Sequence, residues 1–139
     1  MHVTRRTTLA LGIGGAAAAL GMVPRTAQAA DAAIENFTGG ADRGAGDLTL
    51  AAPEIAENGN AVPIELVAPG AVAVLLVAPA NPAPEVLTLR FPDAGGPNRL
   101  ATRIRMAESQ TLTAVAEMAD GRFVEATARV QVTVGGCSV

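Results

Sequence analysis

The sequence has no lysine, tryptophan or tyrosine, and it contains one histidine, His2, and one cysteine, Cys137. Ser-His-Asp and Cys-His centres need an imidazole to move a proton, and a Schiff base needs a lysine. Zinc and copper sites, including the two-histidine site of cupredoxins, also depend on imidazole. Because His2 lies in a segment expected to be removed, we predict no catalytic residues, no metal site and no cofactor.

Basic charge is also scarce, since ten arginines face thirteen acidic residues. Without the first 29 residues, seven arginines remain against thirteen acids, which gives a formal charge of −6 over about 110 residues. Nucleic-acid-binding domains carry clustered basic charge, so we expect no nucleic-acid partner. A chain of this length is predicted to form one domain with one modest core.

Residues 1–29 are predicted to form an export signal. Arg5 and Arg6 precede an apolar run, residues 9–23, which is shorter than the roughly 20 residues that span a bilayer. The small-x-small triplet 27–29 predicts cleavage after Ala29. A buried alanine-rich helix is the alternative, but four glycines in the run disfavour it.

The paired arginines indicate the route of export. The stretch Thr4-Arg5-Arg6-Thr7-Thr8-Leu9 resembles a twin-arginine signal, although Thr8 stands where that pattern prefers phenylalanine. A general secretory signal is the alternative. Either route predicts a periplasmic protein whose mature form has no membrane span.

The mature chain reads as an all-β protein, an immunoglobulin-like β-sandwich of about seven strands over residues 30–134. Residues 30–47 are expected to form an irregular arm or a short helix followed by a loop. Turn signals such as Asp120-Gly121 separate short runs of alternating polarity. The expected strands lie near residues 48–50, 62–66, 72–77, 87–91, 103–106, 112–118 and 124–134.

Two of these strands carry further predictions. Pro63 lacks an amide donor, which predicts an edge position for the strand at 62–66. Residues 72–77 are apolar on both faces, which predicts a strand buried on both sides, with a partner as the candidate for covering one of them. Met106 and Met118 fall on apolar faces and are expected to fill the core.

Two pairs of charged residues are candidates for a site. Glu54 and Glu57 are interpreted as two solvated acids before a turn rather than a catalytic pair, since neither has a recognisable partner. Arg103 and Arg105 share one face of a strand, where they either meet solvent or dock an acidic partner.

The last strand is followed by Gly135-Gly136-Cys137-Ser138-Val139. The glycines impose no backbone preference, so residues 135–139 are expected to form a flexible arm that carries the thiol roughly 10 Å from the strand. Cys137 has no second cysteine to pair with and no nearby base to lower its pKa. The chain therefore offers an attachment point whose activation must come from another protein, unless the cysteine is incidental or forms an interchain disulfide.

Several segments together resemble the SoxY family, the sulfur carriers of the periplasmic thiosulfate-oxidising system. The similarity covers nearly all of the mature chain and agrees with a twin-arginine leader. The segments are 53–60 (Pro-Glu-Ile-Ala-Glu-Asn-Gly-Asn), 81–86 (Asn-Pro-Ala-Pro-Glu-Val), 102–105 (Thr-Arg-Ile-Arg), 114–121 (Ala-Val-Ala-Glu-Met-Ala-Asp-Gly) and 132–137 (Val-Thr-Val-Gly-Gly-Cys).

The resemblance implies an immunoglobulin-like SoxY-type domain over residues 30–134, a heterodimer with SoxZ and transient contacts with SoxAX, SoxB and SoxCD. It implies that Cys137 carries sulfur intermediates covalently, that Gly135 and Gly136 are the glycines of the arm, and that the protein is not itself an enzyme. Ser138 and Val139 replace two glycines of the family pattern, which leaves open whether this is a primary or a secondary carrier. The alternative is a non-catalytic exported interaction module.

Overall fold

The computed structural model describes residues 25–93 and 95–133, which form one helix and nine strands. Seven strands correspond to the seven predicted from the sequence, although the one predicted at 103–106 lies at Arg99–Ile104, and the two others, β1 and β3, have two residues each. The elements are α1 (Arg25–Thr38), β1 (Arg43–Gly44), β2 (Thr49–Ala51), β3 (Ile55–Ala56), β4 (Val62–Val67), β5 (Ala71–Val77), β6 (Glu85–Arg90), β7 (Arg99–Ile104), β8 (Gln110–Met118) and β9 (Phe123–Val132).

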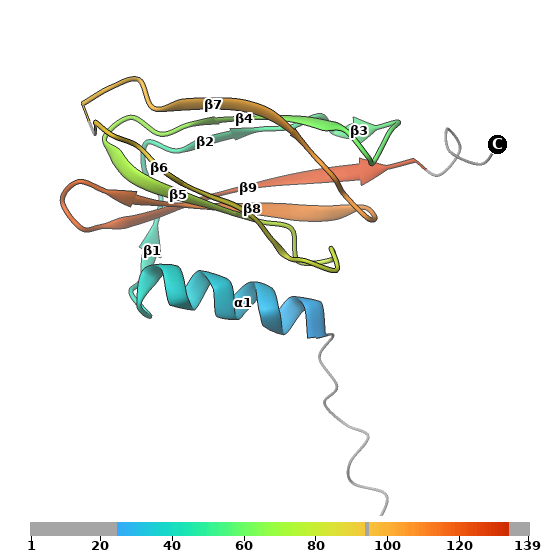
Figure 1. Cartoon of the computed structure of the whole chain (residues 1–139), viewed down its shortest axis with the longest axis horizontal. Helices are drawn as coiled ribbons and strands as arrows, with labels where there is room; N and C mark the ends of the chain where they lie inside the picture. The colour runs from blue at the N-terminus through green and yellow to red at the C-terminus, as the bar shows by residue number, and fades with distance from the viewer. Residues whose placement is uncertain (1–24, 94, 134–139) are drawn as a thin grey trace, which may run out of the picture.

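The strands form two facing sheets, which confirms the predicted sandwich (Figure 1). One sheet has the order β1-β9-β8-β5-β6, with β3 also paired to β9, and the other has the order β2-β4-β7. Between them lies an aliphatic core built from valine, leucine, isoleucine and alanine, with Met106 buried in it and Met118 packed against it. Both methionines therefore fill the core as predicted.

The β8–β9 hairpin follows the alternation seen in the sequence. Leu112, Ala114 and Ala116 of β8 are fully buried, and Val124 and Val130 of β9 face the same core. Gly121 has a φ of +88°, a conformation that costs glycine little, and it lies in the turn that joins the two strands. The strand ends at Val132, two residues earlier than predicted.

The prediction that residues 62–66 form an edge strand is wrong, because β4 lies between β2 and β7. The reason is local. β2 pairs with β4 only from Glu65 to Val67, so no β2 residue lies opposite Pro63, which pairs with Arg103 of β7 on the other side. Pro63 thus lies in the part of β4 that pairs with β7 but not with β2.

The second apolar face of β5 is covered by the chain itself rather than by a partner. Helix α1 lies across the outer face of the larger sheet (Figure 1). Ala30, Ile34 and Phe37 fall on one side of the helix, at spacings of four and three residues, and pack against Leu75 and Val77. This helix is the short helix anticipated within residues 30–47, and it begins earlier, at Arg25.

The helix ends where the sequence provides a glycine. Gly39 has a φ of +65°, and its amide donates to the Glu35 carbonyl at 2.8 Å. Since α1 runs across Ala29 and Ala30, the predicted limit between signal and domain stays a prediction. No helix within residues 25–93 and 95–133 is long and apolar enough to cross a membrane.

Candidate functional site

The predicted attachment residue Cys137, the arm glycines Gly135 and Gly136, and the signal arginines Arg5 and Arg6 lie outside the described residues. The structure does describe the place from which the arm departs. This is the end of β9 at Val132 and the next residue, Thr133, at the extremity of the sandwich where β3 also lies (Figure 1). The candidate site is therefore built from the base of the arm.

On one side, the short strand β3 holds the base of the arm. Its two residues pair in parallel with Gln131 and Val132. The Gln131 amide donates to the Glu54 carbonyl at 2.8 Å, and the Thr133 amide donates to the Ala56 carbonyl at 3.0 Å. The backbone is thus hydrogen-bonded up to four residues before Cys137.

On the other side, a side chain takes the place of a strand. β8 begins at Gln110, opposite Val130, so it has no residue to pair with Val132. The Ser109 hydroxyl accepts the Val132 amide at 2.8 Å and donates to the Val132 carbonyl at 3.3 Å. Both backbone groups of the last β9 residue are therefore bonded to one serine.

A buried amide pair supports the turn that carries Ser109. Asn81 and Gln110 are 7% and 4% exposed, and the Gln110 amide donates to the Asn81 side-chain oxygen at 3.0 Å. Asn81 also donates to the Arg105 carbonyl at 2.7 Å and accepts the Ala107 amide at 2.9 Å. Since the pair is well bonded, it holds the turn between β7 and β8 in one conformation.

Gly59 completes the support beneath β9. Its carbonyl accepts the Met106 amide at 2.7 Å. A Cβ atom at this position would lie 2.7 Å from the Met106 carbonyl oxygen and 3.1 Å from Cγ1 of Val132. The close approach of these three residues requires glycine here. In the sequence, Gly59 lies between Asn58 and Asn60, a pattern typical of a turn that gives no sign of this contact with β9.

The surface next to the base combines an apolar side chain with a shallow hollow. Ile55 of β3 is 58% exposed, whereas its neighbour Ala56 faces the core. The hollow has a volume of about 770 Å³, and Ile55 lies on its rim together with Arg129 and Gln131 of β9. Glu54 and Glu57 are exposed here, as expected for solvated acids.

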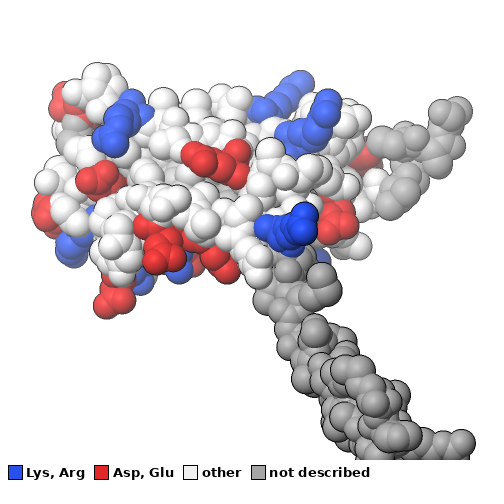
Figure 2. Space-filling view, turned by 60° about the horizontal axis from the view of Figure 1, so that its bottom comes forward, with Lys and Arg blue, Asp and Glu red and all other residues white. Residues whose placement is uncertain are grey.

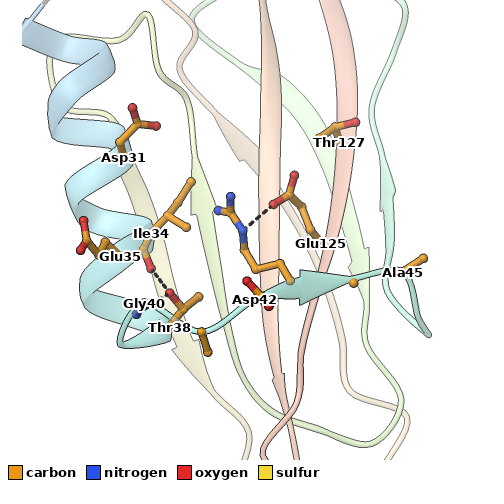
Figure 3. Close-up of a pocket in the computed structure, with 12 residues that line it drawn as sticks. Asp31, Ile34, Glu35, Thr38, Gly40, Asp42, Ala45, Glu125 and Thr127 are labelled. Carbon is orange, nitrogen blue, oxygen red and sulfur yellow. Dashed lines mark hydrogen bonds and ion pairs between the residues drawn. The ribbon is translucent and has the colours of Figure 1, made fainter.

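A second hollow of about 900 Å³ lies between α1, β1 and β9 (Figure 3). An ion pair of 2.9 Å between Arg43 and Glu125 joins β1 to β9 across it. Asp31 and Glu35 of α1 add two further carboxylates to the lining. Nevertheless, the described part of the chain contains no group of three His, Cys, Asp or Glu side chains placed to hold a metal.

The charge on one face of the molecule is mixed rather than segregated. The face that carries α1 has acidic and basic side chains interspersed, without a continuous basic area (Figure 2). Arg103 and Arg105 are both exposed, at the end of β7 and just beyond it, so they are accessible to solvent or to an acidic partner.

Comparison with known families gives a match over residues 34–137 to the family described as sulfur oxidation protein SoxY. The chain belongs to the SoxY family. The match spans most of the sandwich and includes Cys137, and it agrees with the resemblance noted from the sequence. Among curated proteins, no sequence matches the chain.

Solved structures support the SoxY assignment. The chain is 30% identical to the sulfur carrier protein SoxY from Chlorobium limicola f thiosulfatophilum, with a TM-score of 0.66, and the match covers 78% of this chain and 99% of that one. A superoxide reductase (neelaredoxin) from Ignicoccus hospitalis is 13% identical with a TM-score of 0.54, covering 63% of this chain and 81% of that one. At that identity, the second likeness concerns the fold alone.

Proposed function

We propose that this SoxY-family chain is a periplasmic sulfur carrier, exported by the twin-arginine route, that holds thiosulfate-derived intermediates on Cys137. It works as a heterodimer with SoxZ and is acted on by the enzymes SoxAX, SoxB and SoxCD rather than catalysing a reaction itself. The observation that carries the proposal is the anchored base of the arm. β9 is hydrogen-bonded on both sides up to Val132, and the only thiol in the sequence follows after two glycines.

In the proposed reactions, the only group that the carrier contributes is the Cys137 thiolate. In the loading step, the Cys137 thiolate and the outer sulfur of thiosulfate form an S–S bond, which gives Cys–S–S–SO₃⁻. Two electrons leave and pass to the redox centre of the loading enzyme. In the next step, water attacks the sulfonate sulfur, which releases sulfate and two protons and leaves the persulfide Cys–S–S⁻ on the arm.

The residues of the chain are consistent with a carrier that offers the attachment point while an enzyme activates the thiol. No histidine or lysine stands near Cys137 in the sequence to lower its pKa, and an unactivated thiol is only a few per cent thiolate near neutral pH. The enzyme must therefore supply the activating charge. The sandwich supplies a rigid base, and the two glycines allow the thiol to enter an enclosed active site.

Mass spectrometry tests the proposal. Purified protein incubated with thiosulfate and the loading enzyme should gain the mass of one S₂O₃ group on Cys137, and a reducing thiol should remove it. The matched control is Cys137→Ser, which should stay unmodified. Normal pathway turnover with the serine variant would defeat the proposal.

The second candidate is a non-catalytic exported interaction module whose cysteine is incidental or forms an interchain disulfide. The observation that favours it is the absence of a second cysteine anywhere in the sequence. A disulfide-linked dimer of protein isolated without reductant, together with failure to load thiosulfate, would support this reading.

A further inference from the structure

We infer that the first turn of α1 unwinds before the export signal is cleaved, and that this unwinding sets the rate of cleavage. The inference rests on the proposed export of the chain and adds a conformational step to it. The bond concerned, between Ala29 and Ala30, lies inside α1 (Arg25–Thr38). We refer to residues 25–29 as the leader turn and to residues 30–38 as the docked helix.

The docked helix holds the residues that pack on the sheet. Ala30, Ile34 and Phe37 lie against Leu75 and Val77, and Ala30 is only 2% exposed. The five residues of the leader turn are all exposed or half-buried, and none of them belongs to the apolar clusters of the described residues. A segment without buried apolar contacts opens at a lower free energy than one that packs on a sheet.

The charges also favour a helix that begins at Ala30. The positively polarised end of α1 carries Arg25, and its first turn contains no acidic residue. When the helix begins at Ala30, Asp31 falls in the first turn, where a carboxylate stabilises the helix. The docked helix therefore has the better N-terminus, and the leader turn gains little from the helix dipole.

Cleavage requires a conformation that the helix does not provide. A peptidase binds its substrate as an extended strand, through backbone hydrogen bonds and pockets for alternate side chains. The small residues to be read are Ala27 and Ala29. Since the twin-arginine route carries folded proteins, the peptidase meets this bond while the domain is folded. Unwinding must extend to Ala30, which then leaves its place against Leu75 and Val77.

The step itself is a hydrolysis without a change of oxidation state. Water adds to the carbonyl carbon of Ala29, and the bond from that carbon to the Ala30 nitrogen breaks. Ala29 keeps a carboxylate, and Ala30 becomes an ammonium group. When the helix recloses faster than the peptidase cuts, the rate of cleavage follows the population of the unwound form.

The first test measures processing of the purified full-length precursor by a signal peptidase, followed by intact mass. Gln28 is exposed and occupies the variable position between the two small residues, so it can be changed without altering them. Gln28→Gly lowers helix propensity and should be cut about threefold faster, whereas Gln28→Ala raises it and should be cut about twofold slower. Equal rates for the two variants would overturn the inference.

The second test uses two valines that lie far from the cleaved bond in the sequence. Val74 and Val77 are both fully buried in β5, but Val77 faces α1 and Val74 faces the core between the sheets. Val77→Ala should be cut about threefold faster or more, because the seat of Ala30 is loosened, and Val74→Ala should stay near wild type. Equal acceleration of both variants would assign cleavage to global unfolding and refute the inference.

The outcomes separate this inference from the carrier function. If the wild-type precursor is cut after Ala29 and every variant is cut at the wild-type rate, the role of the helix alone is refuted. If the peptidase does not cut after Ala29, the predicted processing fails together with the inference. Loading of thiosulfate on Cys137 is measured on the same protein without the peptidase, so it judges the carrier function independently.

Discussion

The hydroxyl of Ser109 bonds to both backbone groups of Val132, accepting from its amide at 2.8 Å and donating to its carbonyl at 3.3 Å. This side chain thereby bonds the two backbone groups of Val132 that a β8 residue would otherwise bond. No β8 residue lies opposite Val132, since β8 starts at Gln110 opposite Val130. The end of β9 is consequently held by a residue 23 positions earlier in the chain.

Ser109→Ala should loosen the end of β9. The substitution leaves the partly buried amide of Val132 without its acceptor, which costs about 1–3 kcal/mol of the free energy of unfolding. Hydrogen exchange should report faster exchange at Val132 and Thr133. Thr111→Ala, at an exposed position of β8, is the control and should leave exchange at β9 unchanged.

Gly59→Ala should destabilise the protein by about 1–3 kcal/mol, because the new methyl group meets the Met106 carbonyl and Val132 in a packed region. Chemical denaturation monitored by circular dichroism measures the change. Gly44→Ala is the matched control, since nothing lies within 4 Å of a Cβ atom there. Equal stability of the two variants would show that the close approach at Gly59 is not needed.

Leu75→Ala and Leu76→Ala should differ in what they release. The two residues are adjacent in β5 and fully buried, but Leu75 faces α1 and Leu76 faces the core between the sheets. Each truncation should cost about 2–5 kcal/mol. Only Leu75→Ala should open the helix to limited proteolysis while the sheets stay protected, and similar cleavage in both variants would contradict the assignment of faces.

The carboxyl of Asp120 is expected to make the free energy of unfolding depend slightly on pH in the acidic range. The pKa of its carboxyl lies below the ordinary value of 3.8, first because it accepts the Arg122 backbone amide and second because the Arg122 side chain donates to it. A lowered folded pKa means that the contribution is fully present above 3.8 and is lost as the pH falls through the folded pKa.

The variant Asp120→Asn provides the comparison for this acid dependence. Wild type should exceed the variant in urea midpoint at neutral pH, and the difference should shrink well below pH 3.8. Because the pair is on the surface, the difference should also fall in high salt. A difference that grows on acidification would have the wrong sign.

The regular strands could be predicted because their side chains alternate over enough residues. Eleven alternating positions from Val124 onward indicated β9, and Asp120-Gly121 indicated its turn. β1 and β3 could not be predicted, since two residues show no periodicity and their pairing with β9 depends on tertiary contacts. The apolar second face of β5 was recognised, but a sequence pattern does not say that α1 covers it.

The candidate site was predicted only in part. Cys137 stood out because it is the single thiol and follows two glycines, whereas the residues that anchor the arm gave no local signal. Ser109 and Asn81 contact their partners across 23 to 26 residues, and serine and asparagine at turns are common for local reasons. Their role depends on which chain segments the fold brings together.

The parallel attachment of β3 to the end of β9 has a mechanical consequence. A pull on Thr133 along the strand axis acts across hydrogen bonds that run sideways to β3 and β8, so these bonds resist as a group in shear instead of opening one by one like a zipper. A protein that pulls on the C-terminal segment would therefore move the whole sandwich before it separated β9 from its neighbouring strands.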